Sequence, residues 1–122
     1  MPTLAIAGGT SPSHGRSITI GIFEQYPEGQ WTPLILSRST KRPLWLQAVD
    51  PDERVKVVAT DYSSKQSITD AIKGVHTFLS VVLTRDATQA ETMIRMLDAA
   101  LDAGVERFVP SYWGVGVNAW GR

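Results

Sequence analysis

Short apolar segments alternate with segments of helical period along this chain of 122 residues. The apolar segments have the length and composition of strands, and those between them combine apolar spacing of three or four with helix-ending residues. This alternation predicts βαβ units and a parallel sheet. The expected strands are residues 3–7, 33–37, 55–59, 75–82 and 106–110, and the expected helices are 13–26, 67–73 and 86–103.

The last helix has the strongest pattern. It is expected to end at Gly104 and to bury one apolar face, formed by Ala90, Met93, Ile94, Leu97, Ala100 and Leu101.

Two other segments are interpreted from their local residues. Ser67 to Asp70 reads Ser-Ile-Thr-Asp, which is typical of a capping box at a helix start. Residues 39–54 contain Pro43 and Pro51 and predict a loop, with at most a short turn at Leu44–Leu46.

The first strand runs directly into a glycine cluster, Gly8, Gly9 and Gly15, which opens the first helix. Glycines let the backbone turn tightly beside a diphosphate, and the helix N-terminus supplies free N–H groups. The spacing departs from strict G-x-G-x-x-G, because Ser11 and Pro12 occupy the region of the middle glycine. A tight turn without a ligand is the alternative, but the βαβ context favours a dinucleotide site.

A cation replaces the expected acid after the second strand. NAD-selective sites carry an Asp or Glu there, yet no acid occurs between Glu28 and Asp50. Arg38 is present instead, and a guanidinium suits the 2′-phosphate of NADP. Lys41 and Arg42 are expected to reinforce it. The alternative is an exposed arginine at a strand end.

Other candidate contacts are weaker. Asp61 follows the third strand and either accepts from the adenine amine or is a turn aspartate that caps the next helix. His14 could donate to phosphate, whereas His76 is expected to be packed, and the two have no metal-ligand spacing. The residues expected to bind the cofactor are Gly9, Thr10, Ser11, His14, Gly15, Arg16, Ser37, Arg38, Asp61 and Val82.

Composition narrows the function classes. Lys plus Arg and Asp plus Glu both number 12, so no electrostatic argument favours nucleic acid or an anionic membrane. There is no cysteine, hence no thiolate metal site or disulfide, which suits a cytoplasmic protein. The apolar stretches are strand-sized, so no membrane span is expected.

Six segments together have a distinctive pattern: Ile6–Thr10, Gly15–Arg16, Leu36–Arg38, Gly74–Val75, Ala103–Ser111 and Tyr112–Gly114. With them, the chain resembles the N-terminal part of isoflavone-reductase-like or NmrA-like proteins, which are atypical short-chain dehydrogenases. The resemblance implies a Rossmann-like three-layer α/β sandwich with strand order 3-2-1-4-5, C-terminally incomplete, forming one NAD(P)-binding domain over residues 1–122. A flavodoxin- or receiver-like domain is the alternative fold, disfavoured because glycines replace the acidic cluster of a receiver.

The resemblance implies an NADP-binding oxidoreductase domain serving reduction of small aromatic or secondary-metabolite-type substrates, with the substrate region beyond this chain. A non-catalytic NAD(P)-binding regulator and a truncated inactive product are the alternatives. Tyr112 replaces the family's usual glutamate, and no lysine follows Ser111, so no catalytic residue is assigned. Under-covered apolar surface near the last strand predicts self-association.

Overall fold

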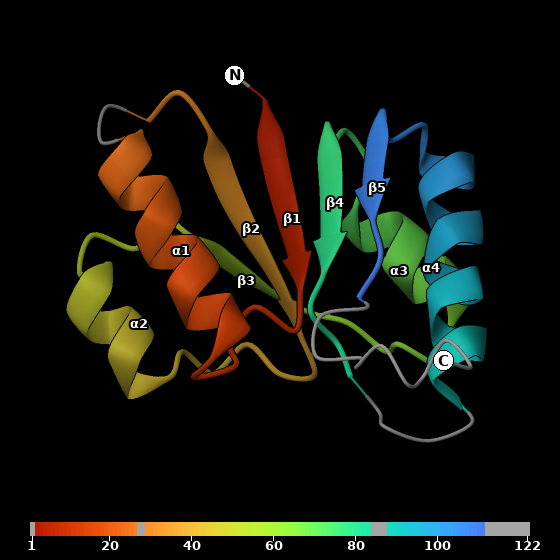
Figure 1. Cartoon of the computed structure of the whole chain (residues 1–122), viewed down its shortest axis with the longest axis horizontal. Helices are drawn as coiled ribbons and strands as arrows, with labels where there is room; N and C mark the ends of the chain where they lie inside the picture. Colours follow the sequence, from red (N-terminus) through yellow and green to blue (C-terminus); the bar gives the residue numbers. More distant parts are fainter. Residues whose placement is uncertain (1, 27–28, 84–87, 112–122) are drawn as a thin grey trace, which may run out of the picture.

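The computed structural model describes residues 2–26, 29–83 and 88–111. Its strands form one parallel sheet in the order β3-β2-β1-β4-β5 (Figure 1), which confirms the expected topology. The strands are β1 (Thr3–Ala7), β2 (Thr32–Ser37), β3 (Lys56–Ala59), β4 (Thr77–Ser80) and β5 (Arg107–Val109). The helices are α1 (His14–Gln25), α2 (Leu44–Val49), α3 (Lys65–Ala71) and α4 (Thr88–Ala103).

Helices cover both faces of the sheet, with α1 and α2 on one side and α3 and α4 on the other (Figure 1). Alternate residues of β1 serve the two layers: Ala5 and Ala7 join the cluster that contains α3 and α4, and Ile6 packs with Ile22 of α1. All three side chains are fully buried. A central strand covered on both faces is therefore apolar at consecutive positions.

The buried face of α4 differs from the expected one. Met93 and Ala100 are buried as expected, but Met96 and Ala99 complete the packed stripe. Ala90, Ile94, Leu97 and Leu101 are exposed instead, with Leu101 at 70%. Apolar residues occur around most of this helix, so their spacing is compatible with more than one buried face. The spacing alone therefore could not predict which face packs on β4, β5 and α3.

Two local interpretations are corrected. Helix α3 begins one turn earlier than the expected capping box, because the Ser64 hydroxyl accepts from the Ser67 N–H at 3.1 Å. The segment read as a loop contains helix α2, which starts directly after Pro43. The fixed φ of proline suits a helix start, so Pro43 initiates structure rather than breaking it.

The rest of that segment is organised by the buried carboxylate of Asp50. Its Oδ2 accepts from Arg42 Nη2 at 2.7 Å and from the Val55 N–H at 2.8 Å, and Oδ1 accepts from the Arg54 N–H at 2.9 Å. Arg42 also donates to the Val55 carbonyl at 2.7 Å. A buried carboxylate is tolerated because cations and N–H groups satisfy it, and here this network joins α2 to the start of β3.

Two glycines of α1 face different surroundings. A Cβ on Gly15 would lie 2.6 Å from the carbonyl carbon of Gly9, whereas a Cβ on Gly21 would meet nothing within 4 Å. Gly15 therefore allows the helix to approach the turn after β1, and Gly21 has no such role.

We expect Gly15→Ala to lower the free energy of unfolding by about 1–3 kcal/mol, because the helix must shift to relieve the overlap. Gly21→Ala, the matched control in the same helix, should raise it by about 0.5–1 kcal/mol through helix propensity. Urea unfolding of both variants measures these changes. Equal stabilisation by the two substitutions would show that the contact of Gly15 with Gly9 is not restrictive.

Candidate dinucleotide-binding site

The glycine turn lies at the carboxyl ends of the central strands. Gly8 has a φ of 76° and donates its N–H to the Leu36 carbonyl of β2 at 3.0 Å. A Cβ on Gly9 would lie 2.8 Å from Ile35 Cγ1, and Gly15 packs on Gly9 in turn. These three glycines hold α1 close to β1 and β2, which is the arrangement that directs a helix N-terminus at a ligand.

Ser11 accepts hydrogen bonds from two of the N–H groups at the start of α1. Its hydroxyl accepts from the Gly15 N–H at 2.9 Å, and its carbonyl accepts from the Arg16 N–H at 3.0 Å. The expectation that α1 presents free N–H groups is therefore corrected for these two donors. A phosphate would have to displace the Ser11 hydroxyl to reach the Gly15 N–H.

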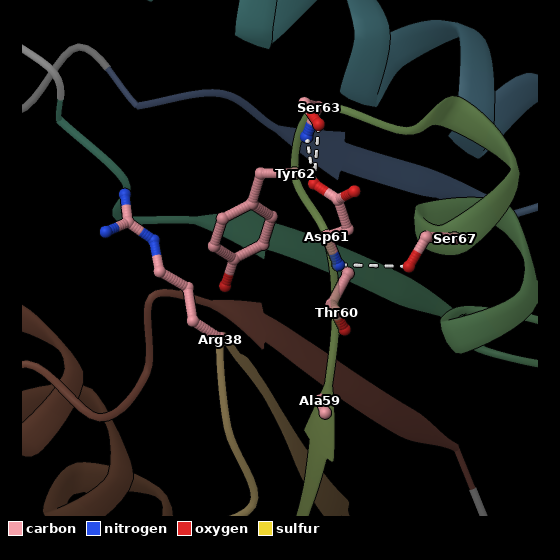
Figure 2. Close-up of a pocket in the computed structure, with 7 residues that line it drawn as sticks. All are labelled: Arg38, Ala59, Thr60, Asp61, Tyr62, Ser63 and Ser67. Carbon is pink, nitrogen blue, oxygen red and sulfur yellow. Dashed lines mark hydrogen bonds between the residues drawn. The ribbon is translucent and has the colours of Figure 1, made fainter.

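Two adjoining clefts open at this edge of the sheet. The first, of about 610 Å³, lies over residues 59–63 after β3 (Figure 2), and the second, of about 440 Å³, lies over the glycine turn. Arg38 and Tyr62 line both. Their volumes fall within the range of ligand sites, and the carboxyl edge of a parallel sheet is where such folds bind ligands. The second cleft is also lined by Gly8, Thr10, Ser11, Ser13, His14, Ser37, Val81, Val82 and Leu83.

Tyr62 is held rigidly between the two clefts. Its hydroxyl donates to the Leu36 carbonyl at 2.5 Å and accepts from the Gly8 N–H at 2.9 Å. Burial raises the pKa of Tyr62 to about 12, against the lowering effects of the Gly8 N–H and of the positive charge on Arg38. The phenol is therefore a neutral donor at physiological pH.

The three basic residues after β2 have different roles. Arg38 is exposed, makes no salt bridge within the described residues, and extends along the first cleft beside Tyr62 (Figure 2). Arg42 is instead bound to Asp50, so the expectation that it reinforces Arg38 is wrong. Lys41 is exposed and lines a third cleft with Ser37 and Ser39.

Asp61 closes the turn after β3 but does not cap α3, whose N-cap is Ser64, and its contact with adenine stays a prediction. It lines the first cleft, and its Oδ1 accepts from the Ser63 N–H at 2.9 Å and from the Ser63 hydroxyl at 2.6 Å. These hydrogen bonds lower the pKa of Asp61. The carboxylate thus closes the turn after β3 while remaining beside the cleft.

The structure brings most of the expected residues together. Thr10, Ser11, His14, Ser37, Arg38, Asp61 and Val82 line the two clefts. Gly9 and Gly15 lie beneath the turn as packing residues, and Arg16 lines neither cleft. The packing expected of His76 is seen at the opposite edge, where its ring contacts Trp31 and Nε2 lies 2.9 Å from Glu106 Oε2.

Two contributors were missed from the sequence. The indole N–H of Trp45 donates to the Thr10 carbonyl at 3.1 Å and joins α2 to the glycine turn. The apolar group around Trp45 directly after Pro43 was the available signal. Tyr62 gave no signal, because its partners, Gly8 and Leu36, are 54 and 26 residues away.

Comparisons with known proteins identify the family and the fold of the chain. The family model of the NmrA-like family matches residues 9–120. The chain belongs to the NmrA-like family. No curated protein sequence matches it significantly. Some of the residues that match the family lie beyond the described ranges, among them Tyr112 and Gly114.

Solved structures of similar fold are much longer than this NmrA-like chain. The NADPH-dependent quinone oxidoreductase QOR2 from Escherichia coli, complexed with NADPH, has a TM-score of 0.66 and 24% identity, with 86% of this chain and 35% of that chain covered. A triphenylmethane reductase from Citrobacter sp. has a TM-score of 0.63 and 23% identity, with 87% and 35% covered. These likenesses show a shared fold.

A third similar structure contains the other nicotinamide cofactor. The dTDP-glucose 4,6-dehydratase DesIV from Streptomyces venezuelae, with NAD and TYD bound, has a TM-score of 0.70 and 20% identity, with 87% of this chain and 38% of that chain covered. The NmrA-like chain thus spans just over a third of each of these structures. Across the described residues, no helix is long and apolar enough to cross a membrane, and no three potential metal ligands cluster.

We expect Arg42→Met to lower the free energy of unfolding by about 3 kcal/mol, because it leaves the buried Asp50 carboxylate without its cation. Arg38→Met, the matched control four residues away, should change stability by less than about 0.5 kcal/mol, since Arg38 is exposed. Urea unfolding compares the two. Similar losses in both variants would contradict the division of roles between these arginines.

The raised pKa of Tyr62 predicts a pH-dependent contribution to stability. The folded chain keeps this proton up to about pH 12, whereas the unfolded chain releases it near 10, so stability should fall as pH rises through that window. The stability advantage of the unmodified chain over Tyr62→Phe should shrink by up to about 3 kcal/mol between pH 9 and 12. Other groups that titrate there, such as Lys65, cancel in this difference. An advantage independent of pH would show that Tyr62 titrates normally.

Proposed function

We propose that this chain is the NADP-binding part of an NmrA-like oxidoreductase. The observation that carries the proposal is the position of Arg38, which lies where the two clefts meet and has no carboxylate partner within the described residues. The glycine turn beside it has the close packing that a diphosphate site needs. When bound, NADPH supplies a hydride, and the residues of this chain hold and orient it.

The described residues fit the cofactor by their chemistry. The adenosine would lie in the first cleft near Asp61, and the diphosphate in the second cleft near His14 and Ser13. The guanidinium of Arg38 would take the 2′-phosphate, with the exposed ammonium of Lys41, which lines the third cleft, as a second cation. Asp61 lines the first cleft from the turn after β3, but among the described residues no acid lines either cleft from the end of β2, where it would select the free ribose hydroxyls of NAD.

The substrate class is a proposal from the family resemblance alone: small aromatic or secondary-metabolite-type molecules, reduced by the longer protein. The alternative is an NmrA-type regulator that binds the dinucleotide without turnover. Its support is local: the position four residues after Tyr112 is Gly116, where short-chain dehydrogenases usually carry the lysine that pairs with a catalytic tyrosine. Consumption of NADPH in the presence of aromatic ketones or enones by the full-length protein distinguishes the two.

Three further proposals concern the chain as a whole. Residues 1–122 act as one NAD(P)-binding domain, and the protein is cytoplasmic. Self-association is supported by the exposed Ile94, Leu97 and Leu101 of α4, which lie on the helix that packs beside the edge strand β5. Sedimentation of the purified chain tests it, and a monomer at all concentrations would oppose it.

We expect the chain to bind NADPH at least tenfold more tightly than NADH. Arg38→Ala should remove most of this preference, because a charge-assisted contact to the 2′-phosphate contributes about 1.5–3 kcal/mol. Arg38→Asp should shift the preference toward NADH. Isothermal titration calorimetry with each cofactor measures the affinities.

Lys56→Ala is the matched control, since Lys56 is an exposed cation at the other end of β3 from the clefts. It should leave both affinities unchanged. Equal affinities of the unmodified chain for NADPH and NADH would oppose the NADP assignment, and an unchanged preference in Arg38→Ala would oppose the role of Arg38.

A further inference from the structure

The hydroxyl of Tyr62 connects the first cleft, in which we propose that the adenosine binds (the adenosine cleft), to the glycine turn. It lies at the end of a side chain that lines both clefts, and it accepts the N–H of the first residue of the turn, Gly8, at 2.9 Å. The same hydroxyl donates to the carbonyl of Leu36, which also accepts from Gly8. The Gly8 N–H from the turn after β1, the Leu36 carbonyl of β2 and the Tyr62 hydroxyl from the β3–α3 turn therefore meet at one point.

The backbone of Tyr62 is fixed as well. Its carbonyl accepts from Arg95 Nη1 of α4 at 3.1 Å, and its ring packs against the cluster that contains Ala7 and Leu36. Because the main chain, ring and hydroxyl are all held, Tyr62 provides a firm support for Gly8 rather than an adaptable one.

The position of Gly8 is transmitted along the turn. On its other side, a Cβ on Gly8 would lie 3.1 Å from Val82 Cγ2, so the turn is confined between the segment that follows β4 and Tyr62. The Gly8 carbonyl accepts from the Ser11 N–H at 3.1 Å, and Ser11 in turn caps α1 through the Gly15 N–H. A shift of Gly8 therefore moves the groups that would face a diphosphate.

We propose that Tyr62 is a positioning residue for the diphosphate of the bound nucleotide, acting through Gly8, while its ring forms one wall of the adenosine cleft. The inference rests on the proposed dinucleotide function. It separates two parts of one side chain: the hydroxyl sets the affinity for the diphosphate, and the ring contributes to the affinity for the adenosine half.

The test uses two ligands that differ in the diphosphate. 2′-Phospho-ADP-ribose contains it, and 2′,5′-ADP carries only single phosphates on the adenosine. In calorimetric titrations, Tyr62→Phe should bind 2′-phospho-ADP-ribose roughly three- to tenfold more weakly than the unmodified chain does, which is the effect of a lost hydrogen bond. Its affinity for 2′,5′-ADP should stay within about twofold of that of the unmodified chain. Tyr62→Leu, which also removes the aromatic wall, should weaken both ligands.

Tyr26→Phe is the matched control, because Tyr26 is 40% exposed and lines neither cleft. It should change neither affinity. Equal weakening of both ligands by Tyr62→Phe, or no weakening of either, would overturn the proposal. If the unmodified chain binds neither ligand, the proposed function itself is wrong.

A measurement on the unmodified chain covers the case in which Tyr62→Phe does not fold. Amide hydrogen exchange at Gly8 should slow severalfold more with saturating 2′-phospho-ADP-ribose than with saturating 2′,5′-ADP. Only the former has a diphosphate that would bind against the turn that Tyr62 supports. The same protection with both ligands would contradict a link between the Gly8 N–H and the diphosphate.

Discussion

The close approach of α1 to the end of β1 is the constraint on which the site depends. Gly15 lies on Gly9 so closely that a methyl group would overlap its carbonyl, and a Cβ on Gly9 would itself lie 2.8 Å from Ile35 Cγ1 of β2. With this packing, the first turn of α1 faces the space above the sheet, and the two clefts open on either side of Tyr62. Larger side chains at these positions would push the helix away and separate the groups that line the second cleft.

A second constraint fixes the chain between β2 and β3. The buried Asp50 carboxylate holds Arg42 and the N–H groups of Arg54 and Val55, and α2 is thereby placed beside the glycine turn. Trp45 of that helix then donates to the Thr10 carbonyl. Arg42 is the arginine that reaches the buried acid, whereas Arg38, four residues earlier, is exposed at the cleft. The different roles of the two arginines therefore follow from their positions relative to Asp50.

The glycine turn is contacted from three directions: by α2 through Trp45, by the segment after β4 through Val82, and by the β3–α3 turn through Tyr62. Ser11 satisfies two N–H groups at the start of α1 from within the turn. Because these N–H groups already have acceptors, the turn pays no penalty for unsatisfied donors when no ligand is bound. A phosphate that binds the Gly15 N–H must displace its hydrogen bond to Ser11.

The sequence by itself determined the order of the five strands and of α1, α3 and α4, the parallel sheet, the glycine turn and the cation at Arg38, because apolar period, glycine and charge are local properties. Tertiary structure decided which face of α4 is buried, that α2 exists, that Arg42 serves Asp50, and that Tyr62 joins Gly8 to Leu36. Each of these depends on groups brought together from distant parts of the chain or on the choice between several apolar faces. The energy of such contacts exists only once the sheet has formed, so no local pattern encodes it.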